Sequence, residues 1–424
     1  KVLEQLRDTE WKQSSKLEYA FIVEKKQLIV KGNGPLDNYT EWINYCRMNN
    51  YNSNKDTPWL KFGKQIKSVY ICYGVTSIGN YAFHECKTLI LLMIQSSVIS
   101  IGKEAFSNCS ALETVVLAEG VSSIGDSAFL GCSKLMDVAI PTSVSSICYS
   151  AFKDCSALET LLIPGTLKKI SRDVFADCSK LRVITIQEGV TELGDYMFAN
   201  CGKLKVVSIP ETVTTIRKGV FYSCKSLVQV TIPTGVTSIF GNPFRNCRQL
   251  QSITVVESNQ YFTSVDGILF DKTLSRLIAC PGTKWKCTIP SSVTTIGWEA
   301  FADCIALESV EIPPSVANIE NCAFSGCIVL ESVNIPVNVT SIQYGTFMNC
   351  KALETVIIPT AVTKIEDDAF RFCSSLVSVA IPASVASIGE ESFHGCKSLK
   401  HVFIPEHLAG LEWKFPRSAN VRIR

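Results

Sequence analysis

The spacing of the cysteines is the feature that most constrains how this chain folds. Thirteen of its nineteen cysteines fall on two series in which every step is 23 residues. The first series is Cys86, Cys109, Cys132, Cys155, Cys178, Cys201, Cys224 and Cys247, and the second is Cys304, Cys327, Cys350, Cys373 and Cys396. A fixed period of this length predicts a repeat protein, in which each unit contacts only its neighbours.

Other apolar positions keep the same register as the cysteines. Phe stands three residues before each of them and Leu three residues after, without exception. Ile stands eight residues before, with Leu193 as the one substitution. The repeating unit reads I-x-x-x-A-F-x-x-C-x-x-L-x-x-V-x-I-P-x-x-V-x-x. A repeat array also explains the length of 424 residues, because a single compact core stops growing near about 250–300 residues.

The repeat divides into a strand and a segment with helical spacing. In residues 135–141, apolar residues at the first, fourth and sixth places end in the period-2 alternation of a short strand, and Pro141, which lacks an N–H, then stops the strand ladder. The Phe-to-Cys and Cys-to-Leu steps of three residues favour a turn or two of helix. One such unit cannot bury its apolar face alone. We therefore predict an α/β solenoid, with a parallel strand ladder on the concave side and short helical turns on the convex side.

The repeat sequence resembles the BspA-type leucine-rich repeats of bacterial and protozoan surface proteins. The resemblance is carried by segments such as Ile232–Ile239 (IPTGVTSI) and Ile381–Gly389 (IPASVASIG), each followed by the Phe, Cys and Leu positions. It covers roughly residues 66–405. The resemblance implies a right-handed leucine-rich repeat superhelix on a secreted or cell-surface protein that binds other proteins, with adhesion to host or matrix proteins as the best-known role.

One insertion and two end segments depart from the period. The step from Cys247 to Cys304 is 57 residues, and within it Asp266-Gly267 separates two apolar runs, which predicts a β-hairpin insertion at about 252–286. Residues 1–65 are predicted to form an N-terminal cap of a β-hairpin plus a helix, with the helix around 41–48. Residues 406–424 are predicted to form a C-terminal cap. Four aromatic residues are candidates for sealing the end rungs: Trp42, Trp59, Trp413 and Phe415.

The strand pattern predicts an exposed apolar patch on the concave face. Side chains alternate along a strand, so the residue between the last two buried positions points outward. Apolar residues at outward places predict a contiguous patch near the N-terminal end, the usual mark of a protein-binding surface. Its members are Tyr70, Leu91, Met93, Val116 and Leu162. The alternative is that residues 1–65 fold over this patch and cover it.

Composition and motifs exclude several function classes. A net charge of +2 gives no positive field for nucleic acid and no polybasic stretch for an anionic membrane. No apolar run approaches the roughly 18 residues of a membrane helix. The central outward acids, Asp137 and Glu311, lie seven rungs apart in the predicted ladder, too far for paired catalytic carboxylates. No nucleophile or zinc motif accompanies the four histidines. We predict no enzyme activity, no cofactor and no metal site.

Two further columns have alternative interpretations. Glu308, Glu331 and Glu354 occupy one register in three consecutive rungs, where stacked carboxylates would attract calcium or a basic partner, or are simply solvated. The ladder cysteines would come within disulfide range, but small buried thiols are the simpler interpretation. Cysteine usage therefore does not decide the redox compartment.

The sequence thus predicts a non-enzymatic protein-binding scaffold outside the cell, and the family resemblance implies an adhesin-like role. A passive structural stalk or coat protein is the first alternative, and a carbohydrate-binding module is the second. Exposed aromatic platforms would favour the second alternative. The partner, the oligomeric state and the role of the insertion stay open.

Overall fold

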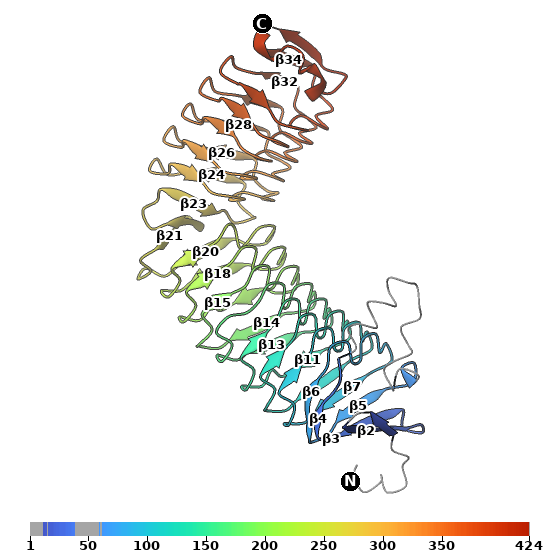
Figure 1. Cartoon of the computed structure of the whole chain (residues 1–424). Helices are drawn as coiled ribbons and strands as arrows, with labels where there is room; N and C mark the ends of the chain where they lie inside the picture. The colour runs from blue at the N-terminus through green and yellow to red at the C-terminus, as the bar shows by residue number, and fades with distance from the viewer. Residues whose placement is uncertain (1–11, 15, 39–58, 60–61, 424) are drawn as a thin grey trace. The chain divides into compact units, whose positions relative to one another are not determined.

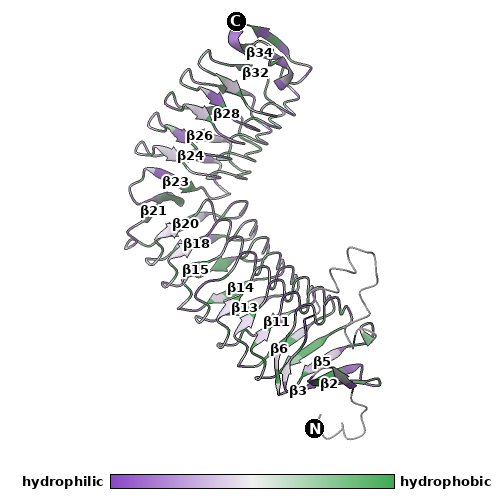
Figure 2. Cartoon of the chain, viewed as in Figure 1, coloured by the Kyte–Doolittle hydropathy of each residue, from purple (hydrophilic) through white to green (hydrophobic). Residues whose placement is uncertain are grey.

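A computed structural model describes residues 12–14, 16–38, 59 and 62–423 of the chain (Figure 1). The chain divides into two compact units, Lys1–Thr214 and Thr215–Arg424. Each unit is a stack of rungs, and most rungs contribute a strand, a second short strand and a run of tight turns. Hydrophilic and hydrophobic residues both occur in the strands, as the hydropathy colours in Figure 2 show.

The longer strands form a parallel ladder in each unit. In the first unit they are β5 (Ser68–Ile71), β7 (Leu91–Ile94), β9 (Thr114–Leu117), β11 (Asp137–Val138), β13 (Thr160–Ile163), β14 (Val183–Ile186) and β16 (Val206–Val207). In the second unit they are β18 (Gln229–Ile232), β20 (Ser252–Val255), β24 (Lys286–Thr288), β26 (Ser309–Glu311), β28 (Ser332–Asn334), β30 (Thr355–Ile357), β32 (Ser378–Ala380) and β34 (His401–Ile404). Regular neighbours pair in parallel with a shift of 23 residues, as Met93 does with Val116. The predicted parallel strand ladder is confirmed.

A second ladder of very short strands lies in the Ile-containing part of each repeat. In the first unit its members are β6 (Val75–Ile78), β8 (Ser100–Ile101), β10 (Ser123–Ile124), β12 (Ser146–Ile147) and β15 (Glu192–Leu193). In the second unit they are β17 (Thr215–Ile216), β19 (Ser238–Ile239), β25 (Thr295–Ile296), β27 (Asn318–Ile319), β29 (Ser341–Ile342), β31 (Lys364–Ile365) and β33 (Ser387–Ile388). Most of the Ile side chains point into the core. Our sequence analysis did not predict this ladder.

The predicted helical turns on the convex side are wrong. The described residues contain no α-helix, and 3₁₀ conformation occurs at Phe62, in η4 (Glu406–Leu408) and in η5 (Glu412–Lys414). The Phe-Cys segment is a series of tight turns in which left-handed residues recur, such as Glu104 (φ 51°) and Asn108 (φ 58°). Alternate N–H groups therefore donate to the next rung, as Phe106 does to Ala128 at 2.8 Å. A helix would direct those N–H groups along its own axis instead.

The repeated Phe and Cys residues form two columns in the core. Neighbouring Phe rings stack, with centroids 5.1 Å apart for Phe83 and Phe106. Most thiols of the column donate to the Phe carbonyl of the preceding rung, as Cys109 Sγ does to Phe83 O at 3.2 Å. Burial raises the pKa of Cys132 to about 12, so this thiol stays protonated and able to donate. All described cysteines are free.

The left-handed position before each ladder cysteine gives a testable stability effect. Gly395 has a φ of 75°, and a Cβ added there would overlap Cδ1 of Phe372. Gly395→Ala is therefore expected to lower the free energy of unfolding by about 1–2 kcal/mol, measured by urea denaturation. Gly202→Ala is the matched control, because no atom lies within 4 Å of a Cβ at that position. Equal stability of the two variants would contradict this account of the turns.

Aromatic side chains continue the Phe column at both ends. Trp59 stacks on Phe83 at 5.2 Å, and its Nε1 donates to Ala82 O at 3.0 Å. Phe415 packs on Phe393 at 4.9 Å, whereas Trp413 is 69% exposed and does not seal the last rung. Trp42 and the helix expected around 41–48 lie outside the described residues. Trp59 and Phe415 thus take the places that further repeats would occupy.

The end segments also extend the sheets. A hairpin of β2 (Leu17–Ile22) and β3 (Gln27–Gly32) precedes β5, and β3 pairs in parallel with β5. The short strands β1 (Lys12–Ser14) and β4 (Gly34–Pro35) pair with β2 and β6. At the other end, β35 (Asn420–Ile423) pairs in parallel with β34. The strand ladder therefore runs on into both end segments.

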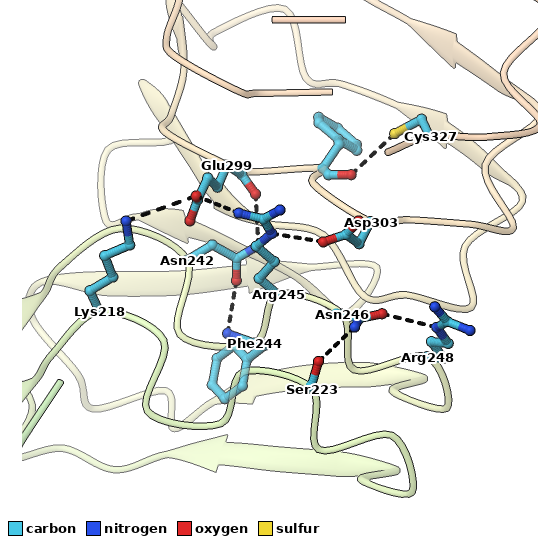
Figure 3. A network of polar contacts seen from close by, with 11 residues as sticks. Lys218, Ser223, Asn242, Phe244, Arg245, Asn246, Arg248, Glu299, Asp303 and Cys327 are labelled. Atoms are coloured by element: carbon cyan, nitrogen blue, oxygen red, sulfur yellow. Dashed lines mark hydrogen bonds and ion pairs between the residues drawn. The ribbon is translucent and has the colours of Figure 1, made fainter. Parts of the chain in front are cut away.

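The insertion between Cys247 and Cys304 is connected to the ladder of very short strands. An antiparallel hairpin is made by β21 (Phe262–Val265) and β22 (Ile268–Asp271), with left-handed Asp266 and Gly267 in its turn. The next strand, β23 (Arg276–Ala279), pairs in parallel with β25. Polar contacts tie the turns on either side of the insertion together, as Figure 3 shows for Arg245 and Glu299. The insertion is therefore integrated into the stack of rungs.

Candidate binding surface

The strand ladder of the first unit carries the five residues that we predicted as a binding patch. Tyr70, Met93 and Val116 are direct cross-strand neighbours on β5, β7 and β9. Tyr70, Leu91 and Met93 are half-buried, whereas Val116 and Leu162 are 42% and 46% exposed. The structure thus places all five on the outward side of the ladder and leaves Val116 and Leu162 the most accessible.

The N-terminal hairpin lies at the end of the ladder. Because β3 pairs with β5, it extends the sheet edge to edge, with Ile29 opposite Tyr70. Residues 39–58 lie outside the described residues, so the alternative of a cap that covers the patch stays untested for that segment. The assignment of Tyr70, Leu91, Met93, Val116 and Leu162 to binding therefore remains a prediction.

Three more apolar side chains are exposed on the same ladder, and we did not predict them. Met136, Val183 and Val206 are 53%, 55% and 58% exposed. Val183 is on the strand next to Leu162, and Val206 stands one period after Val183. Met136 directly precedes β11, one rung before Leu162. We call Val116, Met136, Leu162, Val183 and Val206 the outward strand face.

Sequence alignment of the repeats was sufficient to find two of these residues. Val183 and Val206 occupy the same outward register as Leu91. Met136 precedes the outward register, at a place where most rungs carry a charged residue, so the strand pattern alone does not indicate its exposure. The outward strand face thus overlaps the predicted patch at Val116 and Leu162 and extends further along the chain, to Val206.

Charged residues border the outward strand face. Asp137, Glu159, Arg182 and Lys205 are exposed on consecutive rungs, with the acids first and the bases after them. None of the four forms an ion pair with another described residue. Unpaired charges beside apolar side chains favour orientation of a partner through complementary charges.

One serine, one histidine and two carboxylates lie close together in the turns of the first unit. His84 Nδ1 lies 2.5 Å from Ser107 Oγ and 3.7 Å from Glu104 Oε2, and its Nε2 lies 4.0 Å from Glu85 Oε1. A catalytic triad needs a carboxylate hydrogen-bonded to the ring nitrogen that does not face the serine, and 4.0 Å is longer than a hydrogen bond. Ser107 is also fully buried. This arrangement therefore links two rungs and does not form a nucleophile.

The glutamates that recur on consecutive rungs of the second unit are not arranged to bind a metal ion. Glu308, Glu331 and Glu354 are all exposed, and Glu354 N donates to Glu331 O at 3.0 Å, which places their backbones on consecutive rungs. Among the described residues, no group of three or more His, Cys, Asp or Glu side chains is placed to hold a metal ion. The same described part of the chain contains no helix that is both long and apolar enough to cross a membrane.

Comparisons with known proteins agree with the repeat architecture. The model for the BspA type leucine rich repeat region matches residues 62–182, 146–266 and 283–413, well over half of the chain. Among solved structures, a leucine rich cell surface protein from Faecalibacterium prausnitzii is 27% identical, with a TM-score of 0.65, over 93% of this chain and 94% of that chain. The pneumococcal vaccine antigen PcpA is 18% identical, with a TM-score of 0.57, over 98% of this chain and 99% of that chain. Comparison with curated proteins finds no match.

Proposed function

The chain belongs to the BspA type leucine rich repeat family, and from this premise we propose that it is a non-enzymatic protein-binding scaffold. The proposal assigns binding to the outward strand face of the first unit. It also includes the half-buried neighbours Tyr70, Leu91 and Met93 at one end of that face. The partner class that we propose is a host or extracellular-matrix protein.

The observation that carries this proposal is the exposure of five large apolar side chains, four of them on regular strands and Met136 directly before one. Strand residues are held in fixed positions by the ladder, so their exposure does not come from loop motion. Apolar side chains clustered on the surface of a soluble domain usually mark a protein-binding site. Binding there would remove them from water, and Asp137, Glu159, Arg182 and Lys205 would supply the polar rim.

Placement outside the cell and the absence of catalysis are further parts of the proposal. The Faecalibacterium prausnitzii relative is named as a cell surface protein, which supports surface display of this chain. The family and the separation of charged groups along the ladder both favour binding over chemistry. A passive stalk or coat protein is the competing function, and it differs in requiring no particular residue on the outward strand face.

Paired aspartate substitutions test the proposal. Leu162→Asp with Val183→Asp is expected to weaken capture of fibronectin, laminin or collagen by at least about tenfold, because charge would be buried against the partner. The control is Ile99→Asp, an equally exposed apolar residue of the same unit that lies off the face. Binding is measured by biolayer interferometry, with circular dichroism to verify folding. Unchanged capture by the double variant would favour the stalk.

A further inference from the structure

We infer that the second unit contains a glycan-binding site, separate from the outward strand face, in which Trp298 packs against a sugar ring. A cavity of about 370 Å³ lies beside the second strand ladder and is lined by Trp298, Asn318, Glu320, Asn321 and Gln343. These residues come from three consecutive rungs, at or just after β25, β27 and β29. The cavity lies at the small end of the roughly 300–1,000 Å³ range of ligand pockets.

Trp298 is held with part of its ring accessible. The Nζ atom of Lys218 lies 3.5 Å from the ring centroid and covers one face of the indole. Gly241 packs beside the same ring, since a Cβ at Gly241 would lie 3.4 Å from Cε3 of Trp298. The residue is still 37% exposed, and it borders the cavity. The indole is therefore a fixed aromatic surface with one part available to a ligand.

The backbone around Trp298 is fixed by charged groups that are themselves paired. Glu320 accepts a hydrogen bond from Trp298 N at 2.9 Å, and its two oxygens contact Arg276 at 2.7 and 2.5 Å. The next residue, Glu299, is buried and pairs with Arg245 Nη1 at 2.7 Å, as Figure 3 shows. A site whose residues are already held in place loses little conformational entropy when a ligand binds.

Three primary amides complete the site. The side chains of Asn318, Asn321 and Gln343 form no hydrogen bond with any other described side chain or backbone group. The backbone carbonyl of Asn321 accepts from Glu299 N at 3.1 Å, which fixes Asn321 beside Trp298. Each amide offers a planar acceptor and two donors. The site therefore combines one aromatic surface with several unused neutral donors and acceptors.

This combination suits a sugar better than a peptide or a cation. A pyranose ring presents C–H groups to an aromatic face and pairs of hydroxyls to planar amides, so both kinds of group are used at once. A cationic side chain would seek a carboxylate, but Glu320 is already paired with Arg276. A peptide strand would need an open sheet edge, and β25 is paired with β23 on one side and β27 on the other.

Saccharide titration of the full chain tests the inference. A panel of galactose, mannose, N-acetylglucosamine and their β-linked disaccharides is screened by saturation-transfer NMR, and hits are titrated by tryptophan fluorescence. We expect at least one saccharide to bind, and Trp298→Ala to weaken that binding more than tenfold. Asn321→Ala and Gln343→Ala are each expected to weaken it three- to tenfold. Trp285→Ala, at an exposed tryptophan of the same unit that does not line the cavity, is the matched control.

Three outcomes would overturn the inference. One is that no saccharide of the panel binds, and another is that binding survives in Trp298→Ala. The third is that Trp298→Ala reduces capture of a deglycosylated protein as much as capture of its glycosylated form, which would make this surface a protein contact. If Trp298→Ala fails to fold, Gln343→Ala decides, because its side chain has no internal partner. Leu162→Asp with Val183→Asp is expected to leave saccharide binding unchanged, so this test is independent of the proposed protein binding.

Discussion

Replacing Phe152 by alanine is expected to lower the free energy of unfolding by about 3–5 kcal/mol. Its ring is fully buried and stacks on Phe129 at 5.1 Å and on Phe175 at 5.6 Å. The rungs on both sides are stacked against it and cannot move together to fill the space without breaking their own strand pairs. The cavity would therefore persist, and its cost would add to the lost burial of the ring.

The same experiment distinguishes a shared core from independent rungs. Urea denaturation of the full chain gives the free energy, and hydrogen exchange shows where the chain opens. We expect faster exchange in the rungs that contain Phe129 and Phe175, because each rung depends on its neighbours. Val183→Ala, on the exposed side of β14, is the control and is expected to change stability by less than about 0.5 kcal/mol. A loss below about 1 kcal/mol for Phe152→Ala would contradict a continuous core.

The core was predictable from sequence because its residues recur at one spacing. The Phe, Cys and Leu positions repeat every 23 residues, and all three columns are buried in the structure. The helical turns were not correctly predicted, because a step of three residues also fits consecutive tight turns. Asn, Asp or Gly precedes the cysteine in most rungs, as at Asn108, Asp154 and Gly395. Those residue types tolerate the left-handed conformation, so they were the signal against a helix.

The two candidate surfaces also differ in how far they can be predicted from the sequence. The exposure of Val116 and Leu162 follows from strand alternation, which is a local property of the sequence. The cavity at Trp298 depends on Lys218 and Gly241, which stand in the same register as Trp298, six residues before a ladder cysteine. Periodicity therefore shows that these three residues share a register. It does not show that the rungs on the two sides of the insertion pack against each other, which is what brings Lys218 and Gly241 to Trp298.

A cluster of charged residues, shown in Figure 3, connects the turns on the two sides of the insertion. Disrupting this cluster is the second change for which we expect a large loss of stability. Arg245 donates from Nη1 to Glu299 and from Nε to Asp303, both at 2.7 Å. Burial lowers the pKa of Arg245, but the charges of Asp303 and Glu299 outweigh it and raise the pKa above its ordinary value. Asn242 adds a hydrogen bond from Nδ2 to Glu299 O at 2.9 Å. The cluster thus joins the turns before and after the insertion.

Arg245→Met is expected to lower the free energy of unfolding by about 2–3 kcal/mol. This loss is smaller than the roughly 3–5 kcal/mol that breaking a fully buried ion pair costs, because the Arg245 side chain is partly exposed. The loss arises because Glu299 remains buried, with Lys218 Nζ 3.9 Å away as its remaining cationic neighbour in the cluster. Removing that charge as well should recover stability, so Arg245→Met with Glu299→Gln is expected to be more stable than Arg245→Met alone. Arg248→Met, an exposed arginine three residues away, serves as the control in the same urea titration. If the double variant were less stable than Arg245→Met, the cost would come from lost packing and not from the unpaired carboxylate.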